Sequence, residues 1–370
     1  MPNSRSATVA ITLVHGTFAR HAEWAGDSSL LRRTLSQLLG DKVVFRRFEW
    51  TGGNTHRDRL RAADLLAEHL LQHTVSDDHR KHFVIAHSHA GNIVLYALRN
   101  PEVARTIAGF VTLGTPFLNC TCRRLTMIEP LLGMAVWVIL MMCCMVGEVS
   151  WLMLLLGFVG PIYILRRLCG FRAISLWNPF SWPDAFAPYL RRLQASLFAQ
   201  LSLQPPPDTP VLCLSATRDE ALIWLRLLVG ASRAMLIVVH ARVLLAVGLA
   251  ILLFWCAEVY SAFKDGSDLG DVFVGMPVWF GIWYGLLCFI VIAIHMLVTA
   301  LILAGPYGFG RRMMFATLLL RFEVTSRLPS SVPVGSGFYR SLAGAGLRHG
   351  RICSDDIVAT DIAAWLARCG

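Results

Sequence analysis

The chain has 370 residues, of which 55% are hydrophobic and only 16% are charged. Soluble domains carry about 25% charged residues, so this composition excludes a protein that is an ordinary soluble domain throughout. The net charge of +10 does not predict nucleic-acid binding, because the Lys and Arg residues form no basic stripe with aromatic side chains between them. Many of them flank two long apolar segments instead, which is typical of cationic anchors at a membrane surface.

The predicted elements alternate between strands and helices in chain order. Strands are expected at 8–14, 43–50, 83–86, 109–113 and 211–214. Helices are expected at 30–39, 58–73, 89–99, 189–203 and 354–369. This alternation predicts an α/β fold, with a mostly parallel sheet covered by helices on both faces. In such sheets the active site lies at the carboxyl ends of the strands, so polar residues that follow strands are the candidates for function.

Ser88 follows the third predicted strand in the stretch "AHSHAG", 86–91, and a predicted helix begins directly after it. A nucleophilic serine usually occupies such a strand-to-helix turn as G-x-S-x-G. Here both flanking glycines are replaced by alanines, each of which adds one methyl group. Ser88 is therefore either a nucleophile in a tighter turn or an ordinary serine at the start of a helix.

The ten cysteines show no spacing of paired zinc ligands, and we expect neither a metal nor a cofactor. No secretory signal pattern precedes the first predicted strand, which favours a reducing compartment and unpaired thiols.

The first apolar segment, Leu131–Leu165, contains a single charged residue, Glu148, near its midpoint. One helix needs about 20 residues to cross a bilayer, so this segment is too long for one crossing and short for two. Arginine pairs at both ends, Arg123-Arg124 and Arg166-Arg167, place the two ends on the same side of the membrane. We therefore expect a tight helical hairpin that either spans the bilayer or dips into one leaflet.

The second apolar segment, from about Met235 to Gly305, is divided by an acidic loop at 258–271 and closed by Arg311-Arg312. This pattern predicts two further crossings, and so a multi-pass protein with about four membrane segments. Arginines on the sheet side and an acidic loop on the far side place the globular part in the cytoplasm. An unusually apolar soluble lid is the alternative interpretation.

Five stretches in chain order resemble motifs of the α/β-hydrolase superfamily, in particular its lipase and esterase branch. They are "LVHGTF" (13–18), "AHSHAG" (86–91), "TLGTPF" (112–117), "SATRDEA" (215–221) and "RHGRICSDDI" (348–357). The resemblance covers the chain outside the apolar segments, from about residue 8 to the C-terminus. It implies an α/β-hydrolase-type sheet flanked by helices, into which two membrane-embedded helical hairpins are inserted.

The resemblance also implies a catalytic triad, with Ser88 as the nucleophile. In this superfamily the order along the chain is serine, acid, histidine. Two of the three histidines that follow the fifth predicted strand lie in or near an apolar segment, which leaves His349 as the base. Asp219, just past that strand, is the expected acid, and Glu220 is the alternative.

Two backbone N–H groups are expected to bind the oxyanion that forms during acyl transfer. One belongs to His89, directly after the nucleophile. The other comes from the loop His15-Gly16-Thr17-Phe18, in which either Thr17 or Phe18 is the donor. The first two residues of this loop are expected to contact the substrate.

The predicted organisation has five parts. They are the first part of the core at 1–124, a membrane hairpin in the lid position at 125–170, a second part of the core at 171–225, a second membrane hairpin at 226–312, and a C-terminal core part at 313–370. We expect a membrane-anchored serine hydrolase that cleaves carboxylic esters of lipids, with the bilayer and an acyl ester as its partners. A thioesterase or acyltransferase with the same triad is one alternative, and a catalytically inactive membrane scaffold is another. The residues do not indicate an oligomeric state.

Overall fold

The computed structural model describes six long stretches of the chain and several shorter ones. They are 9–40, 43–76, 81–123, 182–203, 209–238 and 346–369, with 297–308, 319–328, 334–340 and the positions 256–257, 260–261, 263–264, 290, 294, 316 and 342. The predicted hairpin at 131–165 and most of the second apolar segment lie outside the described residues. Within the described residues, no helix combines the length and the apolar character that a membrane crossing requires.

Six strands form one sheet in the order β2-β1-β3-β4-β6-β8, and every neighbouring pair is parallel. The strands are β1 (Val9–Val14), β2 (Val43–Phe48), β3 (Lys81–His87), β4 (Ile107–Leu113), β6 (Val211–Ala216) and β8 (Val334–Tyr339). The register places Val14 opposite Ala86 and Ala86 opposite Thr112. The predicted α/β fold with a mostly parallel sheet is confirmed, and its arrangement fits an α/β-hydrolase.

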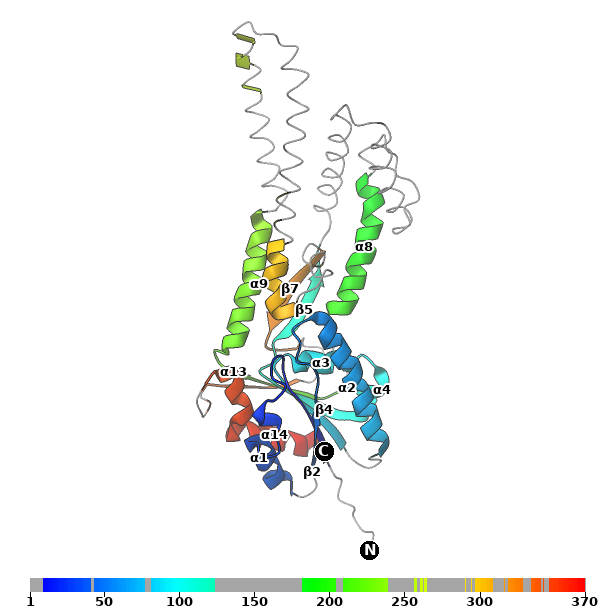
Figure 1. Ribbon diagram of the computed structural model, residues 1–370, viewed down its shortest axis with the longest axis vertical. Helices are drawn as coiled ribbons and strands as arrows, with labels where there is room; N and C mark the ends of the chain where they lie inside the picture. Colours follow the sequence, from blue (N-terminus) through cyan, green and yellow to red (C-terminus); the bar gives the residue numbers. More distant parts are fainter. Residues whose placement is uncertain are drawn as a thin grey trace.

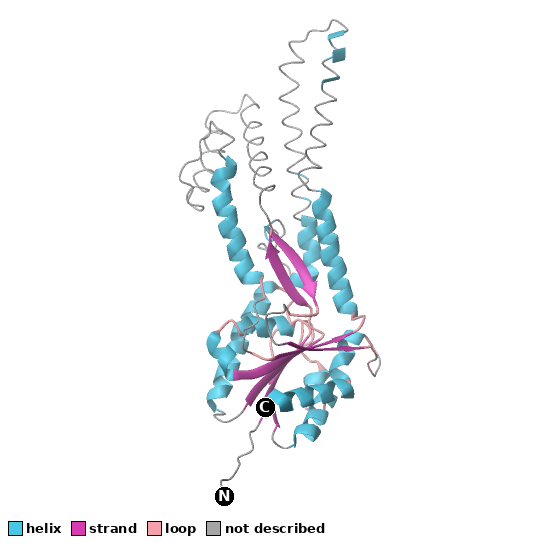
Figure 2. Ribbon diagram, turned by 180° about the vertical axis from the view of Figure 1, so that it is seen from behind, coloured by secondary structure: helices cyan, strands magenta, loops and turns pink. Residues whose placement is uncertain are grey.

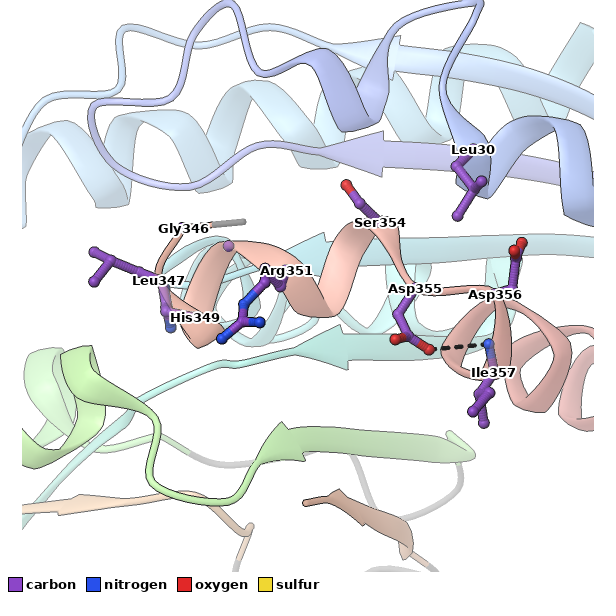
Figure 3. A pocket seen from close by; sticks show the side chains of 10 residues that line it. Leu30, Gly346, Leu347, His349, Arg351, Ser354, Asp355, Asp356 and Ile357 are labelled. Carbon is purple, nitrogen blue, oxygen red and sulfur yellow. Dashed lines mark hydrogen bonds between the residues drawn. The ribbon is translucent and has the colours of Figure 1, made fainter. Parts of the chain in front are cut away.

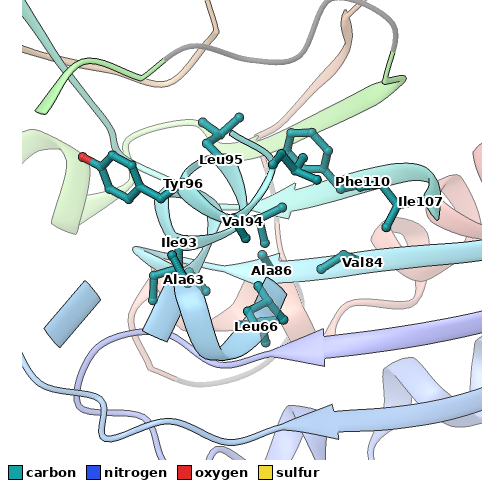
Figure 4. Packing of buried hydrophobic residues seen from close by; sticks show 14 of the residues in the cluster. Ala63, Leu66, Val84, Ala86, Ile93, Val94, Leu95, Tyr96, Ile107 and Phe110 are labelled. Carbon is teal, nitrogen blue, oxygen red and sulfur yellow. The ribbon is translucent and has the colours of Figure 1, made fainter. Parts of the chain in front are cut away.

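Helices cover both faces of this sheet, as Figures 1 and 2 show. Alternate residues of the strands, among them Val84 and Ala86, pack against α2 (His56–Ser76), α3 (Ala90–Ala97) and α4 (Pro101–Thr106), and Figure 4 shows part of this cluster. The residues between them, such as Phe83 and Ile85, pack against α1 (Leu30–Leu39) and α14 (Asp356–Cys369). Each fully buried large side chain stabilises the fold by about 1.5–3 kcal/mol. Because successive side chains of a strand point to opposite faces of the sheet, these strands contribute to two apolar cores, one on each face.

A second, two-stranded sheet lies beyond the carboxyl edge of the main sheet (Figure 2). It pairs β5 (Phe117–Cys122) with β7 (Leu320–Thr325) in antiparallel register. Both strands pack in a third apolar cluster with α8 (Trp182–Leu201), α9 (Glu220–Val238) and the helical stretch at 297–307. This cluster joins the segments that lead into and out of the apolar parts of the chain.

Three strands were not expected from the sequence: β5, β7 and β8. In β8 the pattern is weak because Gly335 and Gly337 have no side chains to pack. A Cβ at these positions would lie 3.1 Å from Leu212 Cδ1 and 2.9 Å from Leu214 Cδ2, respectively, so the neighbouring strand supplies the apolar contact. Helix α9 is continuous across positions 225 and 226, where the sequence places a boundary between two parts of the chain.

Candidate active site

The carboxyl ends of the parallel strands meet along one edge of the main sheet, and the predicted site residues follow these ends. The loop His15-Gly16 comes after β1, Ser88 after β3, and Gly114 after β4. Asp219 comes after β6, and His349 lies in α13 (Arg348–Arg351), after β8. Because these strands are neighbours, segments that are far apart in the sequence share one rim.

Ser88 occupies a strained turn between β3 and α3. Its φ angle is 56°, a conformation that non-glycine residues rarely adopt. The turn is held by the Ser88 N–H, which donates to the carbonyl oxygen of Leu113 at 2.8 Å. The N-cap of α3 is His89 and not Ser88, so the structure does not give Ser88 the position of an ordinary capping serine. Such strain is typical of an exposed nucleophile at the end of a strand.

The strained turn leaves no room for larger neighbours. A Cβ on Gly16 would lie 2.9 Å from Ser88 Cβ and 3.5 Å from its Oγ. A Cβ on Gly91 would clash with Thr115 Oγ1, the hydroxyl that donates to the Ser88 carbonyl at 2.9 Å. The two alanines of the motif, at positions 86 and 90, are fully buried in the core. Their methyl groups therefore pack inside the protein and leave the serine side of the turn open.

The structure brings Asp219 and His349 together. Nδ1 of His349 lies 2.9 Å and 3.1 Å from the two carboxylate oxygens of Asp219, and Asp219 is buried. Gly114 makes this approach possible, since its φ is 57° and an added Cβ would lie 3.2 Å from His349 Nδ1 and 3.3 Å from Asp219 Oδ2. A carboxylate in this place holds the imidazole with Nδ1 protonated, and the other ring nitrogen can then accept a proton.

Glu220 has a different set of partners. Its two carboxylate oxygens accept the backbone N–H groups of Arg348 and His349, each at 3.3 Å. Burial acts to raise the pKa of Glu220, but these bonds and one to its own backbone outweigh it, so that the pKa is lowered. Glu220 therefore holds the first turn of α13, while the neighbouring Asp219 contacts the imidazole.

The side chain of His15 lies in the core and offers no surface to a substrate. It is fully buried and stacks on Trp50 with the ring centroids 5.6 Å apart. Its Nδ1 donates to the Gly16 carbonyl at 2.9 Å, and its Nε2 accepts the Trp50 N–H at 3.3 Å. Burial lowers the pKa of His15, which keeps the ring neutral. In the structure His15 thus joins the loop after β1 to the end of β2.

The two expected oxyanion donors of this loop differ in their hydrogen bonds. The Phe18 N–H donates to the Gly52 carbonyl at 2.9 Å, and the Phe18 side chain is 83% exposed. The Thr17 hydroxyl is buried and has no hydrogen-bond partner within the described residues. The backbone N–H of Phe18 therefore already has an acceptor, whereas the Thr17 hydroxyl has no partner among the described residues.

His89 lies directly after Ser88 and is also buried. Burial lowers its pKa well below 6.5, and the charge of Arg59 lowers it further. Its Nδ1 has no partner among the described residues. The His89 ring is thus a neutral polar group beside the candidate nucleophile.

A cavity of about 920 Å³ lies along α13 and the start of α14 (Figure 3). His349 is one of its lining residues, and the others include Leu347, Arg351, Asp355 and Ile357. Ser88 does not line it, so this cavity lies on the outer side of the histidine loop. We do not assign the substrate to it.

Neither a protein-family model nor a curated protein sequence matches this chain. Several solved structures are similar to it over part of their length. A lipase of Bacillus licheniformis is 14% identical, with 58% of this chain and 67% of the lipase covered and a TM-score of 0.28. A thioesterase of the Streptomyces coelicolor prodiginine pathway is 16% identical, with 57% and 72% covered and a TM-score of 0.26. A proline iminopeptidase of Mycobacterium smegmatis is 11% identical, with 58% and 77% covered and a TM-score of 0.24. Because these TM-scores lie below 0.5, we base the fold on the strand order and the hydrogen bonds described above.

Proposed function

We propose that this protein is a membrane-anchored serine hydrolase that cleaves carboxylic esters of lipids. Ser88 is the nucleophile, His349 the general base and Asp219 the acid that orients it. The observation that carries the proposal is the Asp219–His349 hydrogen bond at 2.9 Å, on the same rim as the strained turn of Ser88. A strained serine at the end of a strand and an aspartate-bound histidine are the parts that acyl transfer by serine requires.

The reaction has two steps. Ser88 Oγ attacks the ester carbonyl carbon and gives its proton to Nε2 of His349, and the resulting imidazolium is stabilised by the Asp219 carboxylate. The C–O bond then breaks, the alcohol leaves with the proton from His349, and an acyl-enzyme remains. In the second step His349 takes a proton from water, the hydroxide attacks the acyl carbon, and the carboxylic acid leaves as Ser88 regains its proton.

The negative oxygen that forms in each step needs preorganised donors. We assign this role to the backbone N–H groups of His89 and Thr17. His89 is the N-cap of α3, so its N–H lies at the positive end of the helix. Thr17 is preferred to Phe18, because the Phe18 N–H already donates to Gly52.

The membrane part of the proposal is supported by exposed apolar side chains on two helical stretches. On α9, Ile223, Trp224 and Leu227 are exposed, although all three are large and apolar. Four described residues between positions 290 and 301 are also exposed and apolar, and their spacing of four, three and four positions is typical of one helical face. They are Ile290, Ile294, Leu297 and Leu301. Such a face is suited to lipid, and tryptophan is favoured at the level of the lipid head groups.

We propose that the two apolar segments anchor the rim of Ser88 at the cytoplasmic face of a bilayer. Acyl chains would then reach Ser88 from the side. Alkaline carbonate extraction of membranes tests the anchor. If the apolar segments anchor the protein, it stays in the membrane pellet. Replacing Arg166-Arg167 and Arg311-Arg312 by Gln is expected to lower activity on bilayer lipid, and unchanged activity would contradict sideways delivery.

A fluorophosphonate probe tests the chemistry, since it reacts covalently with activated serines. We expect the full-length protein in membranes to be labelled and Ser88→Ala to remain unlabelled. Absence of labelling of the wild type would overturn the hydrolase and favour a membrane scaffold. Lipid profiles of cells that express wild type or Ser88→Ala then separate hydrolysis, which releases free acid, from acyl transfer, which produces a new ester or thioester.

A further inference from the structure

His87, the last residue of β3, contacts the backbone of His349. Its Nε2 lies 3.0 Å from the carbonyl oxygen of His349. A carbonyl oxygen only accepts hydrogen bonds, so Nε2 carries the hydrogen and donates it. Nδ1 is then the bare nitrogen of the neutral ring, and it is buried with no partner among the described residues. The hydrogen bond thus fixes one tautomer of His87.

The ring of His87 also contacts two other aromatic rings. Its centroid lies 4.9 Å from that of His349, with 44° between the ring planes. Trp24 contacts it edge-on at 5.9 Å. His349 is therefore held through its backbone and its ring by His87, in addition to the carboxylate of Asp219 at Nδ1.

Burial is the main reason why the His87 ring stays neutral. Burial lowers the pKa of His87 to about 3, the charge of His349 lowers it too, and a backbone hydrogen bond and Asp219 raise it. When His349 is protonated, the neighbouring ring thus carries no positive charge that would oppose it. A cationic side chain in this place would repel the imidazolium.

We propose that His87 is a positioning residue, a neutral donor that holds the carbonyl and the ring of His349 in place for proton transfer. This proposal rests on the function proposed above. The role differs from that of Asp219, which acts on Nδ1 of the imidazole, and from that of Glu220, which accepts backbone N–H groups of the same turn.

Two substitutions separate the donor from the ring. His87→Phe keeps an aromatic ring but removes the donor, whereas His87→Gln keeps an N–H donor. With a soluble p-nitrophenyl ester and the full-length protein, we expect His87→Phe to lower kcat by about ten- to a hundredfold with little change in KM, because small displacements of a catalytic group cost this much. His87→Gln should recover most of kcat. If His87→Phe keeps the kcat of wild type, or if Gln rescues nothing, the proposal is wrong.

His69→Phe is the matched control. His69 is a partly buried histidine of α2 whose Nε2 has no hydrogen-bond partner in the described part of the chain, and its ring centroid lies 5.4 Å from that of Phe48. It lies outside the candidate site, so this variant should keep the kcat of wild type. A comparable loss in His69→Phe would show that the change at position 87 acts through general destabilisation.

A chemical readout is independent of turnover. Diethyl pyrocarbonate acylates neutral imidazoles that it can reach, and mass spectrometry follows the reaction at His349. We expect His349 to react several times faster in His87→Phe than in wild type, and at the wild-type rate in His69→Phe. Equal rates in wild type and His87→Phe would overturn the positioning role. The wild type could lack esterase activity and probe labelling while His349 still reacts faster in His87→Phe than in wild type. In that case the proposed function fails, and the positioning of His349 by His87 stands.

Discussion

Nδ1 of His349 lies 2.9 Å from Oδ2 of Asp219, although 130 residues separate them in the chain. The approach follows from the sheet, because β6 and β8 are parallel neighbours with Ala216 opposite Tyr339. In the sequence, Asp219 precedes the second apolar segment and His349 follows it, after β8. The two residues come together because they follow neighbouring strands of the same sheet.

Asp219→Asn and Glu220→Gln separate the acid from its neighbour. We expect Asp219→Asn to lower kcat by about 10⁴-fold, because an amide does not hold the required tautomer of the histidine. Glu220→Gln should cost about tenfold at most, since the amide oxygen still accepts one of the two backbone N–H groups. Initial rates with a soluble ester measure both variants. Equal losses would contradict the assignment of Asp219.

Gly16→Ala tests the close approach to the nucleophile. The added methyl would lie 2.9 Å from Ser88 Cβ and 3.0 Å from the His87 carbonyl oxygen, and neither atom can move freely. We expect stability to fall by about 1–3 kcal/mol and probe labelling of Ser88 to slow strongly.

Gly230→Ala is the control for this substitution, because a Cβ on Gly230, in α9, would meet no atom within 4 Å. We expect it to raise stability by up to about 1 kcal/mol, as alanine favours helix. Labelling of Gly16→Ala at the wild-type rate would show that Gly16 does not limit the turn.

Thr17→Val separates a role of the Thr17 hydroxyl from the role of the Thr17 backbone N–H. The Thr17 hydroxyl is buried without a partner in the described part of the chain, so its removal should raise the melting temperature slightly. If the hydroxyl also donates to the oxyanion, kcat should fall by about tenfold or more. Thr17→Ser keeps the hydroxyl and should retain kcat. An unchanged kcat in Thr17→Val would mean that Thr17 binds the oxyanion through its backbone N–H alone.

The buried His87 predicts a loss of stability in acid. Its pKa is about 3 in the folded protein and about 6.5 when unfolded. Between these two values the unfolded chain binds one more proton, so the free energy of unfolding falls by about 1.4 kcal/mol per pH unit as the pH decreases. His87→Phe removes the side chain that takes up this extra proton on unfolding. We expect its melting temperature to fall less than that of wild type between pH 7 and pH 5, and an equal fall would contradict the neutral state of His87.

The turn at Ser88 was predictable from the sequence because its signal is local. Four apolar residues of β3 run into the motif and an apolar helix follows it, so that burial of strand and helix fixes the turn between them. The strands β1, β4 and β6 are predicted for the same reason, since each is a continuous run buried on both faces. Apolar periodicity reports which face of an element is buried, and this information lies within a few residues.

The partners of single polar atoms were decided only by the tertiary structure. Asp219 and Glu220 are adjacent acids in sequence, yet one meets the imidazole and the other meets the N–H groups of α13. The Phe18 N–H bonds to Gly52, and His87 bonds to His349, a residue 262 positions away. A hydrogen bond depends on a few tenths of an ångström and on the direction of one donor. These values depend on how strands that are far apart in the sequence pair in the sheet, so a local sequence pattern cannot predict them.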